Sequence, residues 1–266
     1  MKQKNTILVI LNSVSLLVML YANYASNTAV FSKFTVSDIS HKYDTLFAPA
    51  GYAFIIWGFL FLLAISFVIY QWFQLKKGDP GQYIKRTGIW FTVGNIANSS
   101  WLYFWTNEMV GWSVILILLL LLSLIILTIQ LRLELDDKPV SIIFFVWWPI
   151  TFYLGWIMVA TIACISAWLV SLQSATYSLS ESIWTISLIL IASVLYLILI
   201  FKRNMREAAL VGAWAFIAIA FRQWNEYDNI GTCAFIAALI LLMASAFHGY
   251  KNRNYNIIAK LKRHEW

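Results

Sequence analysis

Amide and aromatic side chains occur together inside one long apolar segment of this chain, Gly88–Trp105. Asn98, Trp101 and Trp105 are spaced i, i+3 and i+7, which places them on one face if the segment is helical. An amide in an apolar environment needs a hydrogen-bond partner, which is either a neighbouring helix or a ligand. The spacing alone leaves both interpretations open.

A second apolar segment, Ile142–Val170, carries aromatic and small residues at helical spacing. Tyr153, Trp156, Ala160 and Cys164 recur at steps of three and four residues and therefore share one helical face. An ordinary packing face is the alternative interpretation of this pattern. A proline a few residues earlier favours a kink, because proline removes one backbone hydrogen bond from a helix.

Trp57 and Phe61 lie four residues apart in a third apolar segment and share a face there. Together the three segments bring Trp57, Trp101 and Trp156 around one predicted apolar pocket. Such a pocket suits a large planar or polycyclic ligand that is held by ring contacts and a few polar groups.

Catalytic and metal-binding patterns do not occur in the sequence. No segment carries a zinc signature, a phosphate-binding glycine loop or a nucleophile elbow. Cys164 and Cys233 lie in apolar segments, away from any partner at metal-ligand spacing, and are predicted to be buried apolar side chains. We therefore predict no catalytic residue, no metal site and no cofactor. No predicted membrane span carries a charge at its middle, which argues against a proton-driven transporter.

The composition is that of an integral membrane protein. Of 266 residues, 61% are hydrophobic and 12% are charged, whereas a soluble domain carries about 25% charged residues. The net charge of +7 comes from short basic clusters between apolar segments. Basic residues interleaved with aromatics on a soluble face would indicate nucleic acid, and this pattern is missing.

Eight apolar segments meet or nearly meet the length of about 20 residues that a membrane-spanning helix needs. They are Ile7–Ala25, Ala50–Phe73, Gly88–Trp105, Gly111–Leu131, Ile142–Val170, Ser182–Phe201, Ala208–Phe221 and Ile230–Phe247. The first has no small-residue cleavage site and is predicted to be a retained helix rather than a signal peptide. The predicted fold class is therefore all-α, a polytopic transmembrane bundle of about eight helices.

The basic residues between the spans predict the topology. If the N-terminus lies on the cytoplasmic side, 16 of the 19 Lys and Arg residues lie on that side as well. The three on the outer side are Lys33, Lys42 and Arg222. Basic residues prefer the cytoplasmic side, so we predict cytoplasmic N- and C-termini and a bacterial inner (plasma) membrane location. Residues 132–138 are predicted to be a solvated mixed-charge loop, and Lys202–Glu207 a topology anchor.

The segments Ala50–Phe73 and Gly88–Trp105 resemble the TspO/MBR family, which comprises the tryptophan-rich sensory proteins and the translocator protein. Family members carry a proline eight residues before a tryptophan, followed by a further aromatic residue, and Pro49, Trp57 and Phe61 have this spacing. Asn98 and Trp101 match the Asn-x-x-Trp motif of the family's third helix.

The segment Ile142–Val170, the fifth in the chain, extends this resemblance and also departs from it. Tyr153, Trp156 and Ala160 match the family's fifth-helix pattern, whereas Phe152 replaces its proline and Cys164 its asparagine. The resemblance covers residues 7–170 and implies a five-helix TspO/MBR-like domain in residues 1–170. Residues 171–266 are then three additional transmembrane helices and a basic cytoplasmic tail.

The resemblance implies a membrane receptor, sensor or carrier for a bulky hydrophobic ligand, a porphyrin or other tetrapyrrole or a sterol-like molecule. The ligand would occupy a Trp-rich pocket between the second, third and fifth helices. The predicted ligand-binding residues are Trp57, Phe61, Asn98, Trp101, Tyr153, Trp156, Ala160 and Cys164. Membrane lipid and a second copy of the chain are the other expected partners. Two alternatives stay open: a membrane enzyme that modifies a lipid-soluble substrate such as porphyrin, and a small-solute transporter.

Overall fold

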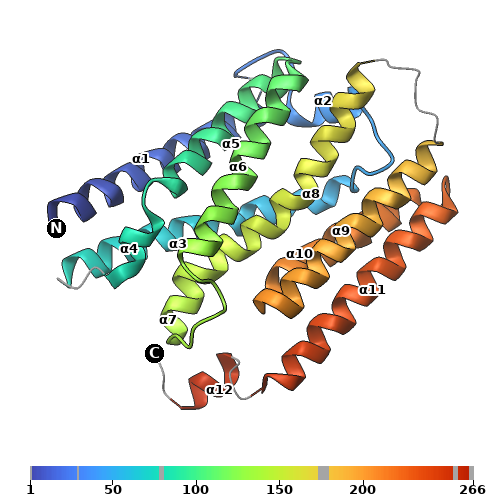
Figure 1. Ribbon diagram of the computed structural model, residues 1–266. Helices are drawn as coiled ribbons and strands as arrows, with labels where there is room; N and C mark the ends of the chain where they lie inside the picture. Colours follow the sequence, from blue (N-terminus) through green and yellow to red (C-terminus); the bar gives the residue numbers. More distant parts are fainter. Residues whose placement is uncertain (1, 29, 78–80, 173–179, 254–256, 264–266) are drawn as a thin grey trace. The chain divides into compact units, whose positions relative to one another are not determined.

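The computed structural model describes residues 2–28, 30–77, 81–172, 180–253 and 257–263, whose regular structure is entirely helical (Figure 1). The long helices are α1 (Lys2–Asn27), α3 (Ile56–Lys76), α5 (Trp90–Thr106), α6 (Val110–Gln130), α8 (Trp148–Ser171), α9 (Glu181–Arg203), α10 (Arg206–Gln223) and α11 (Asp228–Lys251). The short helices are α2 (Val36–Lys42), α4 (Gly81–Thr87), α7 (Val140–Ile142) and α12 (Ile257–Lys262). A 3-10 turn, η1 (Gly51–Ile55), leads into α3, and a π-helical turn, η2 (Ile143–Trp147), leads into α8.

Each of the eight predicted spans corresponds to one long helix, so the predicted all-α class is confirmed. Six helical segments among the described residues are long and apolar enough to cross a membrane: α1, η1 with α3, α6, α7 with α8, α9 and α11. The helix α5 has only 17 residues, and α10 carries charged residues in its terminal turns. Membrane crossing by α5 and α10 stays a prediction, as do the cytoplasmic termini.

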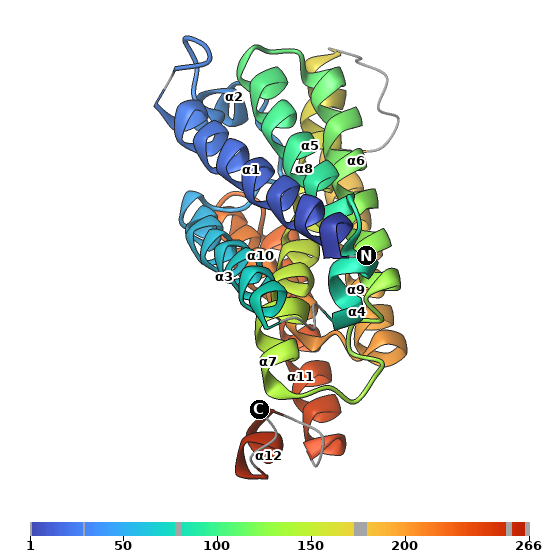
Figure 2. The same ribbon diagram turned by 90° about the vertical axis from the view of Figure 1, so that its left-hand side faces the viewer.

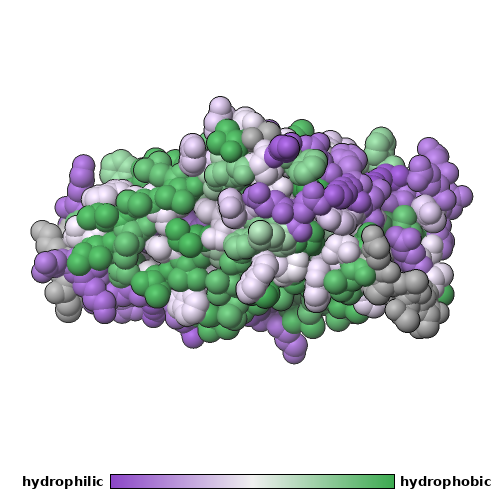
Figure 3. All heavy atoms as spheres, turned by 90° about the horizontal axis from the view of Figure 1, so that it is seen from above, coloured by the Kyte–Doolittle hydropathy of each residue, from purple (hydrophilic) through white to green (hydrophobic). Residues whose placement is uncertain are grey.

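Large apolar side chains lie exposed along the spanning helices, as expected for surfaces that contact lipid. Leu17 on α1, Leu62 on α3, Ile115 on α6 and Phe247 on α11 are more than half exposed. Figure 3 shows apolar side chains over much of the face that is seen from above. In water such a surface would favour aggregation, whereas hydrocarbon solvates it.

The chain divides into two compact units. Unit 1 comprises Met1–Thr45, Phe61–Leu131 and Ala163–Ser174, and unit 2 comprises Leu46–Leu60, Arg132–Ile162 and Ala175–Trp266. Unit 2 therefore combines the C-terminal helices with residues from the predicted five-helix part. The predicted division of the sequence at residue 170 stays a prediction.

In unit 1, α1 packs beside α5, and α5 packs on α6 (Figures 1 and 2). A close helix approach at Gly94 supports the second pair, because a Cβ at Gly94 would lie 2.7 Å from Ser123 Oγ of α6. Small residues at such positions let helix backbones come near enough for good packing in a membrane.

In unit 2, α10 lies against both α9 and α11 and is the most alanine-rich helix of the unit. The phenol of Tyr196 on α9 is fully buried and donates a 2.6 Å hydrogen bond to the carbonyl oxygen of Gly155 on α8. Its ring lies against Gly212 of α10, where an added Cβ would be 2.4 Å from Tyr196 Cε2. Tyr196 therefore contacts two further helices, and at Gly212 its ring occupies space that an added Cβ would fill.

The segment before α3 is attached to α10 by several hydrogen bonds. Gln223 Nε2 donates to the carbonyl oxygen of Leu46 at 2.9 Å, and Trp214 Nε1 donates to that of Ala53 at 3.2 Å. The amide of Ala50 in turn donates to the carbonyl oxygen of Ala218 at 3.2 Å. These bonds fix where η1 and α3 begin within unit 2.

The contact between Tyr196 and Gly212 predicts the effect of adding one methyl group. Gly212→Ala forces that ring or the helix backbone to shift, and we expect the free energy of unfolding to fall by about 1–3 kcal/mol. Thermal unfolding of the detergent-purified protein measures this loss as a lower Tm. Gly58→Ala on α3 is the control, since an added Cβ there meets nothing within 4 Å. Equal Tm values for the two variants would contradict the packing described.

Candidate functional site

Four aromatic side chains of unit 2 form a connected group, here called the aromatic cluster: Phe54, Trp57, Tyr153 and Trp156. The ring centroids of Trp57 lie 6.0 Å from those of Tyr153 and 6.3 Å from those of Trp156, and both pairs are edge-to-face. Phe54 meets Trp156 edge-to-face at 5.8 Å. Such pairs stabilise a structure by about 0.5–1.5 kcal/mol each beyond the burial of their area.

Two local features position the aromatic cluster. Tyr153 and Trp156 project from one face of α8, which begins directly after the π-helical turn η2 and carries Pro149 in its first turn. Proline is tolerated there because a helix's first amides have no internal acceptor. Trp57 lies in the first turn of α3, whose start is held by the hydrogen bonds to α10.

The aromatic cluster contains a buried donor without an acceptor. Trp156 is only 2% exposed, and its ring Nε1 has no hydrogen-bond partner among the described residues. Buried indole N–H groups normally find an acceptor, because leaving one unpaired costs free energy. Phe54 at the edge of the cluster is 41% exposed. The cluster therefore connects the accessible ring of Phe54 to the buried indole N–H of Trp156, which has no acceptor among the described residues.

The predicted residues of unit 1 form a separate set. Asn98 Oδ1 accepts a 3.0 Å hydrogen bond from Asn23 Nδ2 of α1, while Asn98 Nδ2 is buried and has no partner in the described part of the chain. The ring centroid of Trp101 lies 6.1 Å from that of Trp105. Cys164 is buried as predicted, and its sulfur lies 3.5 Å from Ser113 Oγ. Cys233 of unit 2, which was also predicted to be buried, is only half-buried.

Asn98 ends a line of buried polar contacts that joins α1 to α3 and α5, here called the amide seam. Asn12 Nδ2 donates to Gln71 Oε1 at 2.9 Å, and Thr92 Oγ1 donates to Asn12 Oδ1 at 3.0 Å. Asn95 Nδ2 donates to Ser15 Oγ at 3.1 Å. Hydrogen bonds between helices contribute about 0.6 kcal/mol on average in membranes, so the seam stabilises unit 1 by a few such increments.

The eight predicted ligand-binding residues divide evenly between the units. Unit 2 holds Trp57, Tyr153, Trp156 and Ala160, of which the three aromatic residues are in ring contact. Unit 1 holds Phe61, Asn98, Trp101 and Cys164. Phe61 and Ala160 are half-buried. The ligand-binding role of all eight stays a prediction.

Unit 2 also contains a cavity that the sequence did not predict, here called the polar pocket. It has a volume of about 300 Å³ and an apolar side formed by Leu135, Ile143 and Trp147. Its polar lining consists of Glu134, Asp136, Asp137, Asn204, Arg206, His248, Asn252 and Lys260.

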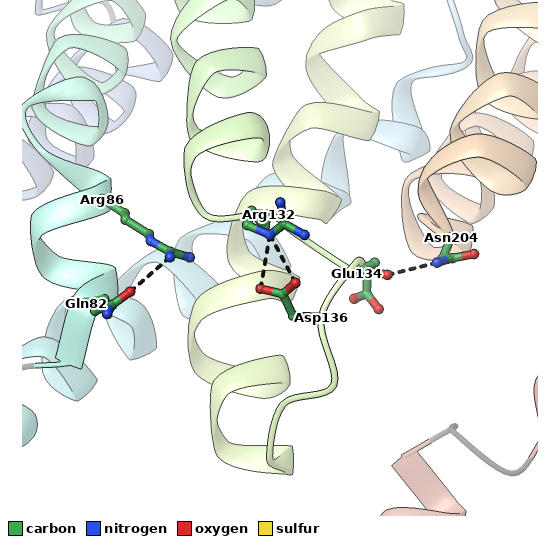
Figure 4. A network of polar contacts seen from close by, with 6 residues as sticks. All are labelled: Gln82, Arg86, Arg132, Glu134, Asp136 and Asn204. Carbon is green, nitrogen blue, oxygen red and sulfur yellow. Dashed lines mark hydrogen bonds and ion pairs between the residues drawn. The ribbon is translucent and has the colours of Figure 1, made fainter.

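The loop of residues 132–138 forms one wall of the polar pocket. Arg132 and Glu134 have positive backbone φ angles of 52° and 58°, which residues other than glycine rarely adopt. Two contacts hold this conformation, as Figure 4 shows. Asn204 Nδ2 donates to the carbonyl oxygen of Glu134 at 2.9 Å, and Arg132 Nε is 3.0 Å from Asp136 Oδ1.

A family model described as TSPO-like protein matches residues 9–247 of this chain. The chain belongs to the TSPO-like protein family. The resemblance drawn from Trp57, Asn98, Trp101, Tyr153 and Trp156 is thereby confirmed at the level of the family. The match continues past residue 170 through α9 and α10 and into α11, so the family pattern includes the C-terminal helices. No curated protein and no solved structure matches the chain.

Glu134 departs from the predicted solvated loop, because the residue is half-buried and its Oε1 atom is fully buried. Burial raises the pKa of Glu134 to about 8, and the negative charge of Glu207 adds to the rise. Burial likewise raises the pKa of Glu207. At the rim of the pocket, the hydrogen bond from Lys260 lowers the pKa of Asp137.

The two buried carboxyls of this TSPO-like protein were missed for a simple reason. Glu134 lies among charged residues in sequence, which is the usual pattern of a water-exposed loop. Its neighbours Asn204 and Arg206, which line the same pocket, are about seventy residues away in the sequence. The signal that the sequence did offer was the neighbouring pair Arg206 and Glu207 directly before an apolar segment.

The raised pKa of Glu134 predicts how stability depends on pH. The unfolded chain ionises this carboxyl above its ordinary pKa of 4.5, whereas the folded chain does so only near 8. Folding therefore loses stability as the pH rises between these two values. We expect Glu134→Gln to have a Tm close to that of the unaltered protein at about pH 5 and a higher Tm at about pH 8. Thermal unfolding in detergent, with exposed Glu226→Gln as the matched control, checks this, and a difference that is the same at both pH values would contradict it.

Proposed function

We propose that this TSPO-like protein binds a bulky planar hydrophobic ligand, a porphyrin or another tetrapyrrole, as a receptor, sensor or carrier. We place this activity in a bacterial plasma membrane. The observation that carries the proposal is the aromatic cluster, in which Trp57 meets both Tyr153 and Trp156 edge-to-face. Family membership supports it, because the same residues carry the resemblance to TspO/MBR proteins.

The chemistry of the aromatic cluster suits such a ligand in two ways. Planar polycyclic molecules gain dispersion energy from ring faces and edges, and aromatic side chains supply large contact areas at little cost in conformational entropy. Trp156 Nε1 offers a buried hydrogen-bond donor without an acceptor of its own. Tetrapyrroles carry carboxylate groups and ring nitrogens that accept hydrogen bonds. A ligand that accepts from Trp156 would remove the cost of burying this donor.

The proposal predicts saturable binding of protoporphyrin by the purified protein. We expect Trp57→Leu to weaken binding by about tenfold, because losing one ring contact worth about 1.4 kcal/mol lowers affinity by that factor. Quenching of tryptophan fluorescence and the shift of the porphyrin absorption band both report binding. Trp224→Leu is the matched control, since Trp224 is half exposed and contacts Phe235 outside the aromatic cluster.

Two results would count against this proposal. Quenching that does not saturate would show that protoporphyrin is not a specific ligand. Unchanged affinity in Trp57→Leu would show that the aromatic cluster is not the binding site. The same samples distinguish binding from an enzymatic reaction. Porphyrin recovered intact after incubation in the dark and in light supports a receptor or carrier, whereas protein-dependent loss of its absorption assigns an enzyme instead.

A further inference from the structure

The polar pocket contains two buried groups with complementary hydrogen-bond needs. Glu134 Oε1 is an acceptor and Arg206 Nε is a donor, and neither has a partner among the described residues. Both residues line the cavity of about 300 Å³. Unpaired buried polar groups cost free energy, and the exceptions in folded proteins often mark sites that a ligand completes.

The other charges of the polar pocket already have partners. Asp137 pairs with Lys260, and Asp136 pairs with Arg132. Arg206 also begins α10, whose N-cap residue Met205 makes no side-chain hydrogen bond. The first amides of a helix carry partial positive charge, which adds to that of the guanidinium. The groups of the polar pocket that a ligand can still contact are therefore the carboxyl of Glu134 and the positively charged start of α10 with Arg206.

We propose that the polar pocket binds a small zwitterion, a molecule in which a primary ammonium and a carboxylate or phosphate lie a few bonds apart. The ammonium contacts Glu134 and the anionic group contacts Arg206. The apolar side of the polar pocket, formed by Ile143 and Trp147 among others, accepts a short hydrocarbon portion. This site uses none of the residues of the aromatic cluster and does not rest on the proposed tetrapyrrole ligand.

Singly charged ligands fit the polar pocket less well. An anion alone would satisfy Arg206 and leave Glu134 Oε1 unpaired, and it would meet the buried carboxyl of Glu207 nearby. An amine alone would satisfy Glu134 and leave Arg206 Nε unpaired. A zwitterion pairs both groups and adds no net charge to a buried site, which keeps the cost of desolvation low. The cavity volume lies at the lower end of the range for small-molecule sites.

Binding of an ammonium group is linked to a proton. Because the pKa of Glu134 is about 8, this carboxyl is mainly protonated at neutral pH. An ammonium pairs with the carboxylate form, so binding releases a proton and its affinity increases as the pH rises toward 8. The titratable and charged groups that face Glu134 are Glu207, Arg206 and Lys260, with Asp136, Asp137 and His248 in the same lining.

Calorimetric titration of the detergent-purified full chain tests the proposal with three matched probes. L-leucine carries both charges, N-acetyl-leucine lacks the ammonium, and leucinamide lacks the carboxylate. We expect L-leucine to bind at least tenfold more tightly than either analogue, and more tightly at pH 8 than at pH 6. The binding enthalpy should also vary with the ionisation heat of the buffer, because a proton is released.

Variants localise the binding to the polar pocket. Glu134→Gln replaces a mainly protonated carboxyl by an amide of the same shape, so it should fold, and Arg206→Gln removes the anion partner. Both should lose at least tenfold in affinity for L-leucine, whereas exposed Glu226→Gln should not. If Arg206→Gln fails to fold, the comparison of L-leucine with N-acetyl-leucine and leucinamide on the unaltered chain still decides the question.

The source of the zwitterion is tested separately, since amino acids and lipid headgroups share this chemistry. Phosphoethanolamine is the soluble probe for a headgroup, and nanodiscs of phosphatidylethanolamine or phosphatidylcholine test the membrane. Choline has no N–H to donate to Glu134, so stabilisation by the ethanolamine lipid alone assigns a lipid headgroup. Binding of L-leucine alone assigns a free amino acid. Binding of neither L-leucine nor phosphoethanolamine, or equal affinity for the three leucine probes, would overturn the proposal.

Discussion

Hydrocarbon offers no hydrogen-bond partner to a polar group, and this constraint organises both units of the protein. In unit 1 the amide seam pairs Asn12 with Gln71 and Thr92, so that α1 is tied to α3 and α5. In unit 2 the phenol of Tyr196 donates a hydrogen bond to the carbonyl oxygen of Gly155. Trp156 Nε1, Glu134 Oε1 and Arg206 Nε are among the buried atoms that have no such partner in the described residues, which is why the proposed ligands are placed beside them.

The helix α10 connects the C-terminal half of the sequence to the candidate ligand residues. It holds the segment before α3 through Trp214 and Gln223, and this segment leads into the first turn of α3, which carries Trp57. Residues that a five-helix pattern would treat as an addition thus form part of the support for the aromatic cluster within unit 2. The family match through residue 247 agrees with this dependence.

The sequence predicted the helices well because lipid imposes a length and an apolarity that each segment must meet by itself. It predicted partners poorly, because Asn98 meets Asn23 from 75 residues away and Asn95 meets Ser15 from 80 residues away. For Asn98 the oxygen accepts a hydrogen bond from a neighbouring helix, whereas a ligand contact of its nitrogen, which has no partner among the described residues, stays a prediction. The burial of Glu134 depends on how a loop folds against distant helices, and composition carries no record of that.

The alanine-rich sequence of α10 has a consequence for how the protein is made. Alanine gains little from entering hydrocarbon, and α10 also carries Arg206, Glu207 and Arg222 near its ends. Such a helix partitions weakly into the bilayer when it leaves the ribosome alone. Its packing surfaces are provided by α9, made before it, and α11, made after it. If α10 crosses the membrane as the sequence predicts, we therefore expect it to become stably inserted together with α9 and α11 rather than alone.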